Sequence, residues 1–251
     1  MQRRTFLMGL GATLAATWQA SAQGPRPPAT NALSIRWFGH MAFGFVGQGV
    51  RLLTHPFRPA GCTERLAAPM MPADLVLIGS RLLDEGYLER LPSDLRVLSQ
   101  PGAYTVNGLD FQGIRTAHDR LEGRRFGMNV VWRWQQAGLR VVHLGGTAAA
   151  LRPEERILIG QPDVLLVPVG GGDKGYTPQE AKAAADAINP KIIIPTHFRT
   201  AKSSDRCELG SRSEFTALFP ETAIRRVNGT TLELRAQELP ATPQVISFGL
   251  P

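Results

Sequence analysis

The stretch that decides the fold class spans residues 163–197 and reads DVLLVPVGGGDKGYTPQEAKAAADAINPKIIIPTH. Residues 164–167 are a continuous apolar run of the length that a buried strand needs. Residues 178–188 have the pattern of a helix that Thr177 can cap. A second strand-like segment, residues 191–194, follows the helix and is apolar after Lys191. A strand, a helix and a strand in this order are typical of the α/β class.

Outward from this stretch, the N-terminal half is rich in short strand-like runs that glycine and other turn residues separate. The predicted strands are residues 34–38, 42–46, 50–54, 75–78, 96–99, 109–117, 129–135 and 139–144, and further helices are predicted at 153–159 and 211–219. Near the C-terminus, residues 224–227 and 230–234 flank Asn228-Gly229, which predicts a type I′ hairpin. This order favours a layered α/β sandwich over a helix bundle, an all-β barrel or a doubly wound sheet.

The composition is that of a folded protein with a sizeable core. The chain has 251 residues, of which 43% are hydrophobic and 20% are charged, and this excludes a mostly disordered chain. Its 28 lysines and arginines exceed its 21 acidic residues, which gives a net charge of +7. The basic residues are scattered along the sequence, so we expect a solvated basic surface and no nucleic-acid partner.

The first residues, MQRRTFLMGLGATLAATWQASAQG, have the layout of an export signal. Arg3 and Arg4 form a positive n-region, an apolar stretch follows, and Ala20-Ser21-Ala22 offers a small-residue cleavage site. The arginine pair, together with the threonine, phenylalanine and leucine after it, resembles the bacterial twin-arginine signal.

We therefore expect a signal peptide at 1–22, a Pro-rich tail at 23–32 and a single domain at 33–251. The expected location is the periplasm, with the export machinery as a partner and no stable membrane anchor after cleavage. An oxidising periplasm would let Cys62 and Cys207 form a disulfide. The sequence equally allows two separate buried thiols.

Several motifs of common enzyme classes are broken or absent in the sequence. The Gly-rich run at 170–175 lacks the order of a phosphate-binding loop, because a glycine follows its lysine. The sequence contains no G-x-G-x-x-G after a strand, no G-x-S-x-G and no H-E-x-x-H. His118 and His197 each follow a strand-like run, where a sheet presents functional groups. His143 lies inside a strand pattern, and we expect it to pack or to bond to the backbone.

Several short segments, in their joint order and spacing, resemble the metallo-β-lactamase fold and, within it, the lactonase-like branch of metal-dependent hydrolases. These segments are IRWFGH at 35–40, LLTHPF at 52–57, DLVLI at 74–78, TAHD at 116–119, VHLGG at 142–146, VPVGG at 167–171 and IPTHF at 194–198. The resemblance implies an α/β fold and, in detail, an αββα four-layer sandwich.

The two metal ions of that family need a dense ligand set, which an H-x-H-x-D-H motif, two further histidines and a bridging aspartate supply. The corresponding positions in this sequence are Ser80, Leu82, Asp84, Glu85, His118, Gly146 and His197. A hydroxyl is a poor zinc ligand, an alkyl chain is none, and a glycine cannot bridge two ions. The resemblance therefore implies the fold and argues against a dinuclear zinc centre.

Two hypotheses about function remain, and the sequence leaves open whether the protein is an enzyme. The favoured one is a divergent, non-catalytic or ligand-binding member of this fold, which binds a small molecule and no metal. The alternative is a mononuclear metal-dependent hydrolase of a small ester, lactone or phosphate-bearing substrate. Its candidate ligands for one Zn, Mn or Fe ion are Asp84, Glu85, His118 and His197. The candidate residues of the substrate cleft are Ser80, Arg81 and His40.

Overall fold

The computed structural model describes residues 30–251, so the predicted signal peptide and most of the predicted tail lie outside the described residues. The strands are β1 (Ala32–Gly39), β2 (Ala42–Gly47), β3 (Val50–Thr54), β4 (Leu75–Leu77), β5 (Val97–Leu98), β6 (Gly102–Val106), β7 (Leu109–Ala117), β8 (Met128–Gln136), β9 (Leu139–His143), β10 (Val164–Pro168), β11 (Ile192–Thr196), β12 (Ile224–Val227), β13 (Thr231–Arg235) and β14 (Gln244–Phe248). The helices are α1 (Pro153–Ile159), α2 (Pro178–Ile188) and α3 (Arg212–Thr216), with short 3₁₀ turns η1 (Gly61–Thr63), η2 (Glu221–Ala223) and η3 (Ala236–Glu238).

The strands form two sheets that enclose the main apolar core. The first sheet has the order β13-β1-β2-β3-β4-β5, and the second has the order β12-β14-β11-β10-β9-β8-β7-β6. Large side chains from both sheets meet between them, and Phe45 contacts Trp134 edge-on with ring centroids 5.0 Å apart. Burying such side chains is the main driving force for packing the sheets.

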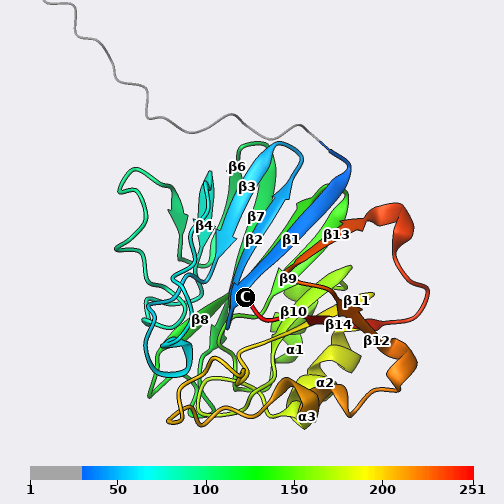
Figure 1. Ribbon diagram of the computed structural model, residues 1–251. Coiled ribbons are helices and arrows are strands. Elements are labelled where there is room, and N and C mark those ends of the chain that lie inside the picture. The colour runs from blue at the N-terminus through cyan, green and yellow to red at the C-terminus, as the bar shows by residue number, and fades with distance from the viewer. Residues whose placement is uncertain (1–29) are drawn as a thin grey trace, which may run out of the picture.

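The helices lie beside the eight-stranded sheet (Figure 1). Helix α2 begins as the sequence predicts, because the Thr177 hydroxyl accepts a hydrogen bond from the backbone of Glu180. Its buried face consists of Ala181, Ala185 and Ile188. No helix within the described residues is long and apolar enough to cross a membrane.

The outer face of the six-stranded sheet is covered in a different way. Leu53, Val76 and Ile78 point outward from it and pack against side chains of residues 71–97. That covering segment contains no α-helix. The predicted α/β sandwich is confirmed, and its layer on this side is irregular chain.

The predicted hairpin around Asn228-Gly229 is wrong. Strand β12 pairs with β14 in the eight-stranded sheet, whereas β13 pairs with β1 in the six-stranded sheet. The turn therefore carries the chain from one sheet to the other. A turn motif specifies a local reversal but not the strand that each arm will pair with, and burial of Leu232 and Leu234 decides that here.

The topology brings several loops to one edge of the sandwich. Strands β9, β10 and β11 pair in parallel, so their carboxyl ends lie side by side. Strands β3 and β4 are parallel in the other sheet. The ends of parallel strands are where α/β folds usually place functional groups, and Asp84, Glu85 and His197 lie in the loops that follow β4 and β11.

Candidate functional site

All five histidines of the chain are buried, and electrostatic coupling links them in one region. They are His40, His55, His118, His143 and His197. An isolated buried histidine is common, but five in one cluster are not expected from packing alone. The cluster divides into three groups with different chemistry.

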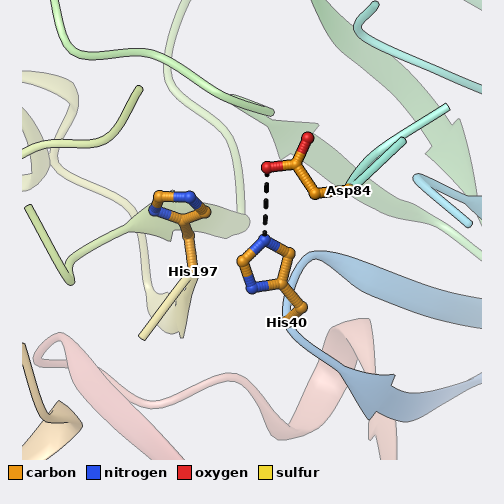
Figure 2. A group of neighbouring side chains, drawn as sticks. All are labelled: His40, Asp84 and His197. Atoms are coloured by element: carbon orange, nitrogen blue, oxygen red, sulfur yellow. Dashed lines mark ion pairs between the residues drawn. The ribbon is translucent and has the colours of Figure 1, made fainter. Parts of the chain in front are cut away.

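The first group consists of His40, Asp84 and His197, whose ligand atoms all lie within 4.8 Å of one another. His40 lies in the turn after β1, Asp84 in the loop after β4, and His197 directly after β11. Figure 2 shows the Asp84 carboxylate facing the His40 ring, with His197 beside them. The His40 Nε2 to Asp84 Oδ2 distance is 3.9 Å, and the two imidazole centroids are 4.6 Å apart.

The two histidines of this group have an unusual backbone. His40 and His197 adopt the left-handed region, with φ values of 51° and 52°. Residues with a side chain rarely adopt this region, and such conformations concentrate at functional sites. The surrounding fold therefore holds both rings in place against local strain.

The donor set of this group fits a divalent metal ion. His40 Nε2 and His197 Nδ1 are buried and have no hydrogen-bond partner among the described residues. Burial, together with the neighbouring His40, holds the pKa of His197 well below its usual range, so its ring is neutral. Burial opposes ionisation of Asp84, but the His40 ring and the Lys174 ammonium outweigh it and lower its pKa. Imidazole nitrogens and carboxylate oxygens are ligand types that zinc prefers.

Lys174 is the fourth member of this neighbourhood. Its ammonium forms an ion pair with Asp84 Oδ2. The lysine belongs to the Gly-rich loop 170–175, for which the sequence predicts no site. Lys174 therefore brings a positive charge to a candidate metal ligand.

The second group is a buried ion pair between Glu85 and His118. His118 Nε2 lies 2.5 Å from Glu85 Oε1, and both side chains are fully buried. Ser80 Oγ donates to the same carboxylate oxygen, and the backbone of Gly146 donates to the other at 3.1 Å. Burial disfavours both charges, but mutual attraction outweighs it, so the pKa of Glu85 is lowered and that of His118 is raised. The pair is therefore charged, and protein groups bond both Glu85 oxygens, whereas His118 Nδ1 has no hydrogen-bond partner among the described residues.

Gly146 explains why this pair can form. A Cβ atom on Gly146 would stand 2.2 Å from His118 Cε1 and 2.9 Å from Glu85 Oε2. A side chain at this position would collide with the ion pair. The absence of a side chain at Gly146 is thus matched to the ion pair of Glu85 and His118.

The third group is a stack of His55 and His143, with ring centroids 4.0 Å apart. His143 Nδ1 accepts from the backbone of Gly145 at 3.0 Å, so Nε2 carries the proton and donates to the carbonyl of Met41 at 3.0 Å. This is the backbone bonding that the sequence predicts for His143. Burial, followed by the charges of His118 and His40, lowers the pKa of His55 to about 3.

The structure arranges the predicted site residues differently from the sequence hypothesis. It brings Asp84 and His197 together, but with His40, which the sequence placed in the substrate cleft, and it places Glu85 and His118 in a separate pair. The two other predicted cleft residues, Ser80 and Arg81, line a pocket of about 500 Å³. Arg115 lines the same pocket.

Sequence reasoning missed the roles of two residues. His40 follows Gly39 at the end of a strand, which is the same kind of position that singled out His197. Lys174 was dismissed with the broken phosphate-loop motif. Only the tertiary structure brings both residues to Asp84.

Comparisons with known proteins agree with the fold. The family model of the beta-lactamase superfamily domain matches residues 34–197. A UPF0173 protein of Pyrococcus abyssi is 43% identical over 185 residues, which cover 67% of this chain and 84% of that protein. A UPF0173 metal-dependent hydrolase of Thermoplasma acidophilum is 24% identical over 192 residues, with coverage of 67% and 84%.

A solved structure also matches over most of this chain. A protein of the metallo-beta-lactamase superfamily from Thermotoga maritima superposes with a TM-score of 0.71 and 34% sequence identity. The match covers 87% of this chain and 100% of that one. By family model, sequence and structure, the chain belongs to the beta-lactamase superfamily and, within it, to the UPF0173 proteins.

Proposed function

We propose that the protein is a metal-dependent hydrolase that uses one divalent metal ion, held by His40, Asp84 and His197. The observation that carries the proposal is the pair of buried nitrogens, His40 Nε2 and His197 Nδ1, which have no hydrogen-bond partner among the described residues and lie beside an ionised carboxylate. Buried polar atoms without partners are costly, and a metal ion would satisfy both. Relatives named metal-dependent hydrolases agree with this assignment.

A divalent ion in this position would supply an activated water and polarise the oxygen of a substrate. The protein's own residues would position the reactants. Phe57 packs edge-on against His40 with centroids 6.3 Å apart and limits solvent access to that ring. Arg81 and Arg115, both exposed at the neighbouring pocket, would attract an anionic group. We infer a small ester, lactone or phosphate-bearing substrate.

A second candidate is a non-catalytic, ligand-binding protein. This candidate is favoured because protein groups already neutralise both carboxylates. His118 pairs with Glu85, and Lys174 pairs with Asp84. Such a protein would bind its small molecule in the 500 Å³ pocket without metal. Metal analysis separates the two candidates.

The test is elemental analysis of the purified protein after exposure to zinc, manganese or iron(II). We expect about one ion per chain and its loss in His197→Ala and Asp84→Asn. Asp186→Asn is the matched control, because Asp186 is an exposed carboxylate that pairs with Lys182 across one turn of α2. Absence of bound metal in the native protein, or two ions per chain, would contradict the proposal.

We also propose that the protein is exported by the twin-arginine route. The support is the order of arginine pair, apolar stretch and small-residue site at the N-terminus. The double change Arg3→Lys and Arg4→Lys is expected to leave the protein in the cytoplasm of a bacterial host. Equal periplasmic amounts of both forms would refute this.

A further inference from the structure

We propose that Lys174 is a built-in competitor of the metal ion, an ammonium that occupies Asp84 when no metal is bound and must leave when metal binds. This inference rests on the proposed function, because it concerns the same site. It goes further in stating what sets the affinity of that site for metal.

The contact itself places the lysine on the ligand. Lys174 Nζ bonds to Asp84 Oδ2, the same oxygen that faces His40 Nε2. An ammonium has no lone pair and cannot ligate a metal ion. A metal ion held by Asp84 and His40 would therefore face a second cation on the same carboxylate, and the two would repel strongly in this partly buried place.

The loop that carries Lys174 is anchored at several points. The fold therefore holds the backbone of Lys174 where its ammonium reaches Asp84. Arg125 forms an ion pair with Asp173 at 2.7 Å. Arg120 donates hydrogen bonds to the carbonyls of Gly172 at 2.9 Å and Gly175 at 3.3 Å. These contacts fix the backbone on both sides of Lys174.

The same loop leaves the metal-facing side of His197 open. A Cβ atom on Gly175 would stand 2.6 Å from His197 Nδ1, the nitrogen that has no partner among the described residues. The absence of a side chain at Gly175 preserves the approach to this nitrogen. The loop therefore provides both the space for a metal ion and the Lys174 ammonium that pairs with Asp84 when no metal is bound.

The Lys174 side chain has room to move when a metal ion displaces it from Asp84. About a fifth of its side chain is exposed, and its Nζ lies 5.7 Å from the centroid of Phe126. The long side chain can rotate toward solvent while its loop stays anchored. The apparent metal affinity then equals the intrinsic affinity multiplied by the fraction of molecules in which Asp84 is free of the lysine.

The test is a titration of the metal-free protein with Zn²⁺, followed by calorimetry or by competition with a coloured chelator. Lys174→Met removes the ammonium, and we expect the dissociation constant to fall at least about tenfold. Lys174→Gln, which keeps a hydrogen-bond donor without the charge, is expected to act in the same direction. Lys182→Met is the matched control, because that lysine pairs with Asp186 on α2 at 2.6 Å.

The outcomes separate this inference from the proposed function. If zinc binds the native protein and both Lys174 variants equally, the competition is refuted and the metal site stands. If neither the native protein nor the variants bind zinc, both are wrong. Tighter binding by the variants than by the native protein and the Lys182 control supports the competition. Thermal melting of each variant checks that it is folded.

Discussion

Gly146 lies so close to His118 that a Cβ atom on the glycine would stand 2.2 Å from the ring. The ring is fully buried and bonded to Glu85, so it cannot simply move away. We expect Gly146→Ala to lower the free energy of unfolding by about 1–3 kcal/mol, the usual cost of overpacking a core. Urea unfolding measures this change.

A double-mutant cycle identifies the cause of that loss. In the background of His118→Ala the clash with the ring is gone and only the contact with Glu85 Oε2 at 2.9 Å remains, so adding Gly146→Ala is expected to cost less than in the native background. An equal cost in both backgrounds would show that the clash with His118 is not the reason.

A second prediction concerns how much the ion pair of Glu85 and His118 contributes to stability. Glu85→Ala removes the carboxylate that keeps the buried His118 ring charged, and removing one partner of a buried ion pair typically costs about 3–5 kcal/mol of unfolding free energy. Glu154→Ala, at an exposed carboxylate on α1, is the control and is expected to change stability by less than about 0.5 kcal/mol. Similar losses in the two variants, measured by urea unfolding without metal, would contradict the role of the pair.

The parts of the fold that depend on local pattern were predictable from sequence. The bounds of β7, α1 and α2 coincide with the predicted ones, because alternation and helix caps are encoded in neighbouring residues. Strands β6 and β14 were missed, and the pairing of β12 was wrong. A strand partner far away in sequence leaves no local signal.

The candidate site was also predictable only in part: the sequence could select single residues but not their grouping. Asp84 and His197 could be selected because each lies a few residues beyond an apolar run and matches a family position. Grouping them with His40 and Lys174 requires three loops to meet, and loop conformation is not encoded by spacing. The sequence thus identified the edge of the sheet that carries the site but not the set of side chains that meet there.

Cys62 and Cys207 form a disulfide that joins η1 to the segment after His197, across 145 residues of sequence. The sequence left this pairing open. Reduction is expected to lower the free energy of unfolding by about 2–5 kcal/mol, because closing a long loop restricts the unfolded chain. Thermal melting with and without reductant measures this, and Cys62→Ser with Cys207→Ser is expected to match the reduced protein. Two free thiols in the purified, non-reduced protein would refute the pairing.

The buried ring of His55 predicts how stability depends on pH. Burial first, and then the charges of His118 and His40, lower its pKa in the folded protein to about 3. In the unfolded chain the pKa of a histidine is about 6.5. Between these values the unfolded chain binds a proton that the folded protein does not. Stability is therefore complete above pH 6.5 and falls as the pH decreases, by about 1.4 kcal/mol per pH unit for this one group.

Comparison with His55→Asn isolates this contribution from that of the carboxylates, which also weaken the fold in acid. The smaller side chain leaves a cavity and lowers stability at every pH, but it binds no proton, so it changes the slope independently of that loss. Urea unfolding between pH 4 and 6 is expected to give a slope for the variant that is shallower by about 1.4 kcal/mol per pH unit. Parallel slopes for the two proteins would mean that His55 takes up a proton in the folded state, and that its buried, neutral ring is not a source of acid sensitivity.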